Sequence, residues 1–301
     1  MTVEFADGET SGSSERRMVT EAISDAVTVL STTGVLSPRV DAELLAGYVL
    51  GVPRGRLLTA SLRPDQESAY RRLVAERARR VPLQHLTGQA HFRHLTLSVG
   101  PGVFVPRPET EQLVSWALTV IRPGATVVDL CAGSGAIALA VATEVPETTV
   151  YAVEGDPAAL GWLRRNAAAT AQATGRPVEV VAGQVGDPAL LSAVDGTVDV
   201  VLCNPPYVPV GTRVPPEVAE HDPPGAVFAG ADGLDLIRAV VPLAARLLRP
   251  GGRVGIEHDE TQAESVPALL AAGGRFSDIR DHPDLTGRPR FATARVAHFT
   301  A

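Results

Sequence analysis

The residues best suited to chemistry form the tetrapeptide Asn204, Pro205, Pro206 and Tyr207, which directly follows an apolar run. Neither proline can donate a backbone N–H, so the pair ends a strand and fixes the backbone after it. The side-chain oxygen of Asn204 and the carbonyl of Pro205 are two acceptors that could hold both N–H bonds of a planar amide or exocyclic amine. Tyr207 could stack on the same group. The alternative interpretation is a stiff turn with no role beyond structure.

Holding a planar nitrogen in this way suits methyl transfer to it. The lone pair of such a nitrogen is delocalised, so catalysis depends on orientation and on acceptors placed where positive charge develops. We therefore interpret Asn204, Pro205 and Tyr207 as catalytic and the whole tetrapeptide as substrate-binding. None of the seven histidines lies in the motif, and the reaction requires no general base before the transfer.

A second candidate site is a glycine-rich turn that follows another apolar run. It begins at Asp129 and continues through Cys131, Ala132, Gly133, Ser134 and Gly135. Glycines allow a ligand close to the backbone, and the helix expected after them offers free N–H groups. Glu154 ends the next apolar run, where a carboxylate can accept both hydroxyls of a ribose. The pattern predicts a nucleoside site.

The turn alone leaves two cofactors open. Residues 133–138 also match the dinucleotide fingerprint with alanine in the last position, which would suit NAD. Asp129 would be unfavourable beside a pyrophosphate but favourable near a sulfonium and an α-amino group. Together with the tetrapeptide, this carboxylate favours S-adenosylmethionine and methyl transfer.

Composition excludes several other chemistries. All 27 basic residues are arginine, so there is no lysine for a P-loop, a protein-kinase site or a Schiff base. Two cysteines, Cys131 and Cys203, are too few for a zinc finger or an iron–sulfur site, and no metal is predicted. A net charge of −7 and an aromatic content of 4% argue against direct binding to nucleic acid.

The expected location is the cytoplasm. No apolar run reaches the roughly 18 residues of a membrane span, and the N-terminus lacks the apolar segment of a signal peptide. Residues 1–17 are rich in Gly, Ser, Thr and Glu, which predicts a disordered tail. We expect a monomer without membrane contact.

Residues 18–83 are expected to form a small all-helical domain that docks the substrate. Apolar residues recur there at three- and four-residue spacing, which predicts helices at Thr20–Leu30, Pro38–Gly51 and Pro64–Pro82. The third helix is interpreted as a solvated face or, alternatively, as a docking surface for an acidic or RNA-associated partner. Its arginines are Arg71, Arg72, Arg77, Arg79 and Arg80.

A hairpin linker is expected at residues 84–105, with its strands within His91–Val99, followed by an α/β domain at residues 106–301. Alternating strands and helices predict a doubly wound parallel sheet, with its ligand at the carboxyl ends of the strands. The expected strands are Thr126–Leu130, Thr149–Val153, Val178–Val181, Val198–Leu202, Arg253–Glu257, Arg275–Asp281 and Phe291–Val296. The expected helices are Pro108–Ile121, Gly135–Glu144, Pro157–Ala171 and Leu234–Leu248.

Five segments together resemble the HemK/PrmC family of protein-(glutamine-N5) methyltransferases, over nearly the whole chain from Met18. They are Pro82-Leu-Gln-His-Leu-Thr-Gly88, Val105-Pro-Arg-Pro-Glu-Thr-Glu111, Asp129 to Gly135, Asn204 to Tyr207, and Asp284-Leu-Thr-Gly-Arg-Pro-Arg-Phe291. The resemblance implies a class I methyltransferase sheet, S-adenosylmethionine as cofactor, and the glutamine of the Gly-Gly-Gln motif in peptide-chain release factors as substrate.

The resemblance also implies roles for individual residues. The segment Cys131–Gly135, Glu154 and Asn204 would contact the cofactor, the tetrapeptide would hold the glutamine, and Phe104–Glu111 would line the entrance. Three features depart from the family pattern: Cys131-Ala132 in the turn, Gln184-Val185 where an acid and an aromatic are usual, and Glu257-His-Asp259 without a glycine.

Three alternatives stay open. A glutamine methyltransferase acting on a ribosomal protein would show the same motifs. An adenine-N6 nucleic-acid methyltransferase shares the tetrapeptide, but it should carry a base-recognition domain, for which the sequence shows no segment. A nucleoside-binding module without catalytic activity would have no reason to combine the tetrapeptide with the glycine turn.

Overall fold

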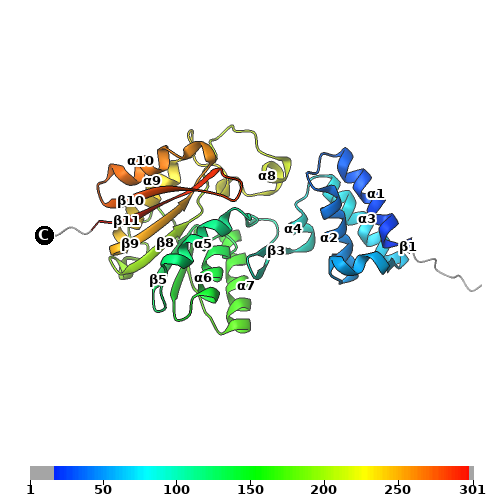
Figure 1. Cartoon of the computed structure of the whole chain (residues 1–301), viewed down its shortest axis with the longest axis horizontal. Coiled ribbons are helices and arrows are strands. Elements are labelled where there is room, and N and C mark those ends of the chain that lie inside the picture. Colours follow the sequence, from blue (N-terminus) through cyan, green and yellow to red (C-terminus); the bar gives the residue numbers. More distant parts are fainter. Residues whose placement is uncertain (1–16, 298–301) are drawn as a thin grey trace, which may run out of the picture. The chain divides into compact units, whose positions relative to one another are not determined.

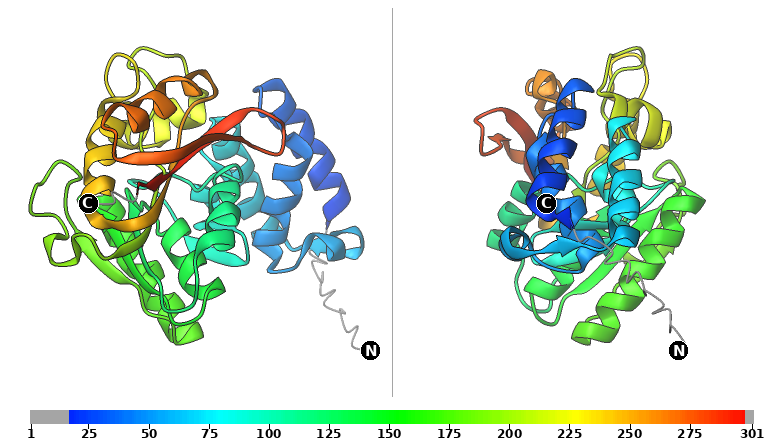
Figure 2. Two further views of the ribbon diagram at one scale, coloured as in Figure 1. Left: turned by 60° about the vertical axis from the view of Figure 1, so that its left-hand side comes forward. Right: turned by 90° about the vertical axis from the view of Figure 1, so that its right-hand side faces the viewer.

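The computed structural model describes residues 17–297, which form two compact units divided between Thr87 and Gly88. The N-terminal unit is mainly helical, and its three long helices lie side by side in Figure 2. They share an apolar core that includes Leu30, Leu45, Leu62 and Tyr70. Its elements are β1 (Arg17–Met18), α1 (Val19–Thr32), α2 (Pro38–Leu50), a 3-10 turn (Arg54–Thr59), β2 (Ser61–Leu62), α3 (Pro64–Ala78) and α4 (Leu83–Thr87). Of the predicted tail, residues 1–16 lie outside the described residues.

The third helix is shorter than predicted. It ends at Ala78 rather than Pro82, and Arg80 takes a left-handed conformation with a φ of 68°. The prediction that Arg77 belongs to a basic docking surface is wrong. Its side chain is buried, and its Nε donates to Asp41 at 2.7 Å. Arg71 and Arg79 are exposed but pair with glutamates of their own helix, so the solvated-face interpretation describes them.

The second unit begins with a two-stranded hairpin, β3 (Gln89–Phe92) and β4 (Leu95–Ser98), followed by a seven-stranded sheet. The strand order is β10-β11-β9-β8-β5-β6-β7, and the doubly wound α/β fold predicted from the sequence is confirmed (Figure 1). The strands are β5 (Thr126–Leu130), β6 (Thr149–Glu154), β7 (Glu179–Ala182), β8 (Val198–Cys203), β9 (Leu248–Glu257), β10 (Phe276–Pro283) and β11 (Pro289–Val296). The helices are α5 (Thr110–Val120), α6 (Ala136–Glu144), α7 (Pro157–Thr174), α8 (Pro216–His221), α9 (Asp235–Leu247) and α10 (Ser265–Ala272).

Two apolar cores lie on opposite faces of this sheet. Helices α5, α6 and α7 cover one face, where they meet Val127 and Val200. Helices α9 and α10 cover the other, where they meet Val128 and Val201. Adjacent residues of one strand thus point into different cores, which explains why the sequences of β5 and β8 show almost no polar alternation.

Strand β9 begins earlier than predicted, at Leu248 rather than Arg253. Its pairing with β8 is irregular, since Val198 pairs with Leu248 whereas Val200 pairs with Arg253. The intervening residues loop out through Gly251, whose φ is 77°. Pro250 and two glycines concealed this extension, because they normally signal a turn.

Within residues 17–297, no helix combines the length and apolar character that crossing a bilayer requires.

Candidate active site

The predicted site residues meet at the carboxyl ends of three neighbouring strands. Leu130 of β5 pairs with Val153 of β6 on one side and with Cys203 of β8 on the other. The residues that follow Leu130, Val153 and Cys203 in the sequence are Cys131, Glu154 and Asn204. Parallel register alone therefore brings the glycine turn, the acid and the tetrapeptide to one edge of the sheet.

Left-handed backbone conformations shape the glycine turn. Cys131 has a φ of 61°, a left-handed conformation that a non-glycine residue seldom adopts, and Gly133 has a φ of 57°. The turn closes through the N–H of Ala132, which donates to the carbonyl of Val153 at 2.9 Å, and the N–H of Gly135, which donates to Ala132 at 2.8 Å. Ala132 and Ser134 are buried.

Asp129 lies beneath the turn rather than on its surface. Its side chain is fully buried, and Oδ2 accepts the backbone N–H of Ala138 in α6 at 3.0 Å. Oδ1 has no hydrogen-bond partner among the described residues. Burial, with a smaller contribution from the charge of Glu154, raises the pKa of Asp129 to about 8.

The carboxylate of Glu154 is held from both sides. Oε2 accepts the N–H of Gly133 and Oε1 accepts the N–H of Asp156, each at 2.8 Å. A carboxylate has about four lone-pair positions, so acceptor capacity remains for two ribose hydroxyls. Beside it, Gln184 donates to the carbonyl of Gly155 at 3.1 Å, which places the residue that departs from the family pattern next to this acid.

These residues fit an adenosine-containing cofactor. A Cβ atom at Gly133 would meet no heavy atom within 4 Å apart from its chain neighbours, so the turn borders open space there. A Cβ at Gly135 would instead approach Leu163 Cδ1 to 2.7 Å. The first glycine thus permits close approach of a ligand and the second permits packing of α6 on α7.

The tetrapeptide continues directly from β8. Pro205 is buried, whereas Asn204, Pro206 and Tyr207 are partly exposed. Nδ2 of Asn204 donates to Oγ1 of Thr110 at 3.0 Å. Thr110 is the first residue of α5, so the entrance segment and the tetrapeptide meet through this hydrogen bond.

Tyr207 is held by its hydroxyl and by its backbone. The hydroxyl donates to Oε1 of Glu257 at 3.3 Å, and the backbone carbonyl accepts Nε2 of Gln262 at 3.0 Å. Burial raises the pKa of Tyr207, so the phenol stays neutral. The backbone of Tyr207 also packs closely on Gly233. Only glycine fits there, because a Cβ would come within 2.1 Å of the Tyr207 carbonyl oxygen.

Glu257 is a fully buried carboxylate at the end of β9. Burial raises its pKa to about 7, whereas the Thr110 hydroxyl, the charge of Arg290 and the Tyr207 hydroxyl lower it. Arg290 lies on β11 and also bonds Asp284 at 3.3 Å. The Asp284–Phe291 segment, quoted above only for its resemblance, therefore supplies the cation of this site.

The entrance segment is fixed by a buried acid. Nη2 of Arg107 donates to Oδ2 of Asp222 at 2.8 Å, and its guanidinium lies 4.8 Å from the centre of the Phe104 ring. Glu111 points elsewhere, because its Oε1 accepts the N–H of Arg93 in the hairpin.

Sequence reasoning missed four polar residues that organise the site: Thr110, Asn166, Glu257 and Arg290. Asn166 is buried in α7 and binds the backbone of Ser98 and the carbonyl of Ser134, which ties the glycine turn to the hairpin. No spacing pattern in the sequence connects these positions. Thr110, Glu257 and Arg290 lie in segments that carry the family resemblance or depart from it, and that was their only signal.

Cys131 and Cys203 belong to the ends of two neighbouring strands, β5 and β8. Both are free thiols. Cys203 is fully buried, and burial together with the Cys131 thiol raises its pKa well above the ordinary value.

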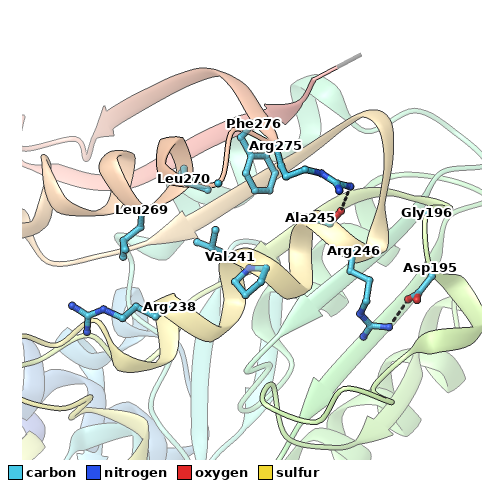
Figure 3. A pocket seen from close by; sticks show the side chains of 12 residues that line it. Asp195, Gly196, Arg238, Val241, Ala245, Arg246, Leu269, Leu270, Arg275 and Phe276 are labelled. Carbon is cyan, nitrogen blue, oxygen red and sulfur yellow. Dashed lines mark hydrogen bonds and ion pairs between the residues drawn. The ribbon is translucent and has the colours of Figure 1, made fainter. Parts of the chain in front are cut away.

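A cavity of about 760 Å³ elsewhere in this unit is separate from the strand ends described above (Figure 3). It lies between α9 and α10, with Val241, Leu269 and Phe276 among its apolar lining. Arg246 at its rim is paired with Asp195 at 2.6 Å. It contains none of the residues predicted for the site.

Comparison with known proteins extends the sequence resemblance. Residues 21–88 match the family model of the PrmC N-terminal domain, and residues 96–220 match that of the methyltransferase small domain. A release factor glutamine methyltransferase of Mycolicibacterium smegmatis is 52% identical over 92% of this chain and 97% of its own length. One from Streptomyces coelicolor is 50% identical over 91% of this chain and 97% of its own length.

A more distant relative, from Streptomyces pristinaespiralis, is named 4-amino-L-phenylalanine/4-methylamino-L-phenylalanine methyltransferase. It is 40% identical over 87% of this chain and 90% of its own length. The two nearer relatives share about half of their residues with this chain over almost their full length, and the family predicted from the sequence is thereby confirmed. This protein belongs to the release factor glutamine methyltransferase family.

Proposed function

We propose that this protein transfers a methyl group from S-adenosylmethionine to the side-chain amide nitrogen of the glutamine in the Gly-Gly-Gln motif of peptide-chain release factors. One observation carries the assignment of the site. Leu130, Val153 and Cys203 are paired in register across three neighbouring strands. The glycine turn, Glu154 and Asn204 directly follow them and therefore meet at the carboxyl edge of the sheet, where ligands bind in this type of fold. Membership of the family identifies the donor and the acceptor.

The proposed cofactor residues are Asp129, the segment Cys131–Gly135, Glu154 and Asn204. Open space over Gly133 and the doubly anchored carboxylate of Glu154 support this set. When bound, S-adenosylmethionine supplies an electrophilic methyl group. Asp129 is proposed to support the glycine turn from the interior, because its side chain is buried and accepts the backbone N–H of Ala138 in α6.

The proposed substrate residues are Asn204, Pro205, Pro206 and Tyr207. Oδ1 of Asn204 and the carbonyl of Pro205 accept the two N–H bonds of the glutamine amide, which fixes the plane of that amide and the direction of its nitrogen lone pair. These acceptors also stabilise the positive charge that develops on the nitrogen. Tyr207 stays neutral and offers its ring to the amide plane.

We further propose that the helical N-terminal unit docks the protein substrate. It has its own core and exposes large apolar side chains, among them Leu36, which is 91% exposed, and Leu58, which is 74% exposed. Exposed apolar side chains of this size are common at protein–protein contacts. Because release factors work on ribosomes, the place of action would be the cytoplasm, with a monomeric enzyme and no direct contact with nucleic acid or membrane.

The test is incubation of the purified protein with S-adenosylmethionine and a purified release factor, followed by mass spectrometry of the proteolytic peptide that contains Gly-Gly-Gln. We expect the glutamine to gain one methyl group, and a release factor with alanine in place of that glutamine to gain none. Methylation of a ribosomal protein instead of the release factor would assign the sister activity and overturn the proposal.

A second candidate function is methylation of a small aromatic amine. It is favoured by the relative from Streptomyces pristinaespiralis, which is 40% identical to this chain. The same acceptors would suit an aryl amine, whose nitrogen is also planar and carries two N–H bonds. Replacing the release factor with 4-amino-L-phenylalanine in the assay separates the two, and we expect no product from it.

A further inference from the structure

The Gly-Gly-Gln motif offers an enzyme little to recognise beyond the glutamine itself. Glycine has no side chain, so two of the three residues provide only backbone groups. The glutamine side chain is the part that the tetrapeptide would hold. Selection of a release factor over other proteins that contain glutamine therefore needs contacts outside the motif, and the nearest of these must be made by a surface beside the tetrapeptide.

The turn between β10 and β11 lies at the same edge of the sheet as the tetrapeptide. Cys203 of β8 pairs with Ile256 of β9, which in turn pairs with Ala292 of β11. Because β11 runs antiparallel to β9, the residues that precede Ala292 continue past the carboxyl edge, where the tetrapeptide leaves β8. His258, which follows β9, still donates its N–H to the Arg290 carbonyl at 2.9 Å. The turn at residues 284–288 therefore projects from this edge, as the red hairpin in Figure 2 shows.

Asp284 holds this turn in one conformation. Its Oδ1 accepts the backbone N–H groups of Thr286 and Arg288 at 2.8 and 3.2 Å, and the Thr286 hydroxyl at 2.6 Å. Its Oδ2 accepts Nη2 of Arg290 at 3.3 Å. The backbone closes the turn, because the N–H of Asp284 donates to the Arg288 carbonyl at 2.8 Å. The side chain of Asp284 is buried, so the residues that follow it are fixed from the inside of the turn.

Leu285 is the residue that this turn presents to solvent, with 88% of its surface exposed. Single exposed apolar side chains are common on proteins and by themselves need no explanation. Leu285 differs because the residues on both sides of it, Asp284 and Thr286, are fixed by the hydrogen bonds of the turn. Its backbone therefore has little conformational freedom left to lose when a partner covers the side chain. A preorganised apolar side chain at the rim of a site suits contact with a second protein.

The spacing of the sheet places this turn within reach of the chain around the glutamine. Strand β9 lies between β8 and β11, and adjacent strands are about 4.8 Å apart, so β11 is roughly 10 Å from β8. An extended peptide covers about 3.3 Å per residue. A release factor whose glutamine is held at Asn204 would therefore pass the turn roughly three to five residues from that glutamine.

We infer that Leu285 is a substrate-recognition residue, which contacts an apolar side chain of the release factor roughly three to five residues from the glutamine of the Gly-Gly-Gln motif. Asp284 is its positioning residue. The inference rests on the proposed function, and it adds a contact that belongs neither to the tetrapeptide nor to the N-terminal unit.

The direct test replaces Leu285 of the full chain with the photo-crosslinking residue p-benzoylphenylalanine. Irradiation with a purified release factor should give a covalent complex, and mass spectrometry should locate the crosslink within about six residues of Gly-Gly-Gln. The matched control has the same replacement at Arg122, an exposed residue in the loop that leads to β5 at the opposite edge of the sheet, and should give no crosslink near the motif. A crosslink from position 285 to another part of the release factor, or none, would overturn the inference.

Steady-state kinetics provide the second measurement. Leu285→Ser removes the apolar contact and should leave the unfolding midpoint unchanged, because the side chain is exposed. We expect KM for the release factor to rise about 5- to 10-fold, with kcat and the affinity for S-adenosylhomocysteine as in wild type. Leu285→Met, whose side chain is also apolar and of similar volume, should keep KM within about twofold of wild type.

The two proposals fail in different ways. If wild type methylates the release factor and Leu285→Ser does so with an unchanged KM, the proposed function stands and the recognition role of Leu285 is wrong. A wild-type protein that does not methylate the release factor would instead overturn the proposed function.

Discussion

Asn204 is proposed to contribute a single oxygen atom, and this makes it the sharpest test at the scale of one residue. The Asn204→Ala variant should fold and still bind S-adenosylhomocysteine, because the glycine turn and Glu154 keep the rest of the proposed cofactor site. Turnover should fall by about 10²–10³, the usual effect of removing one group that stabilises developing charge. Steady-state kinetics with a release factor measure this, and near wild-type turnover would contradict the role.

Glu154 allows an independent test of the cofactor site. Glu154→Gln keeps the size of the side chain but replaces one acceptor oxygen with a donor, so it loses the anchor to either Gly133 or Asp156 and the ribose hydroxyl that the same oxygen would accept. We expect affinity for S-adenosylhomocysteine to fall about 10-fold, measured by calorimetry. Unchanged affinity would count against the ribose contact.

Asp129 should make stability depend on pH in a direction opposite to that of an ion-paired carboxylate. Its pKa is about 8 in the folded protein and near 3.8 when exposed, so the folded state holds the proton more tightly. This contribution to stability is complete below pH 3.8 and is lost as the pH rises toward 8. The unfolding midpoint of wild type should therefore fall relative to Asp129→Asn between pH 5 and pH 8.

The control for this prediction is Asp187→Asn, an exposed aspartate in the loop after β7. Its unfolding midpoint should differ from that of wild type by the same amount at both pH values. A difference between wild type and Asp129→Asn that does not change with pH would show that Asp129 remains ionised when folded.

At the scale of elements, the two glycines of the turn should respond differently to the same change. Both have positive φ, which costs an alanine roughly 1 kcal/mol. Gly135→Ala should lose a further 1–3 kcal/mol or so because its Cβ would strike Leu163, whereas Gly133→Ala has room for its Cβ. Denaturant unfolding should rank Gly135→Ala as the less stable.

Cofactor affinity should rank the same two variants in the opposite order from stability. In Gly133→Ala the added methyl group enters the space where we place the cofactor, so binding should weaken although stability is nearly retained. In Gly135→Ala the folded fraction should bind with nearly normal affinity. Normal binding by Gly133→Ala would show that the cofactor lies elsewhere.

The elements themselves could be predicted because their signals are local. The predicted bounds of β5 match the structure, and α6 differs by one residue, since buried apolar runs bounded by turns leave few alternatives. The end of α3 could not be predicted in this way, and neither could the burial of Arg77. This side chain pairs with Asp41 in a tertiary contact that no helical pattern reveals. Thr110 and Glu257 were missed for the same reason, as they become neighbours only when α5 and β9 pack together.

At the scale of the whole molecule, the proposed cofactor and substrate residues all belong to the second unit. Residues 88–301 expressed alone should therefore bind S-adenosylhomocysteine with an affinity within about threefold of that of the full chain, measured by calorimetry. Methylation of the release factor should be strongly reduced, mainly through a higher KM, because the proposed docking unit is missing. An unchanged KM would contradict a docking role for the N-terminal helices.

The strand order has a consequence for the folding of this protein during its synthesis. Although β11 follows β10 in the chain, it lies between β10 and β9, and it brings Arg290 to Glu257 and Tyr207. During synthesis on the ribosome, the turn, the acid and the tetrapeptide all emerge well before this strand. A nascent chain that stopped short of β11 would leave one edge of β9 unpaired and the Glu257 carboxylate without its cation, so competence for methylation arrives only after β11 has been translated.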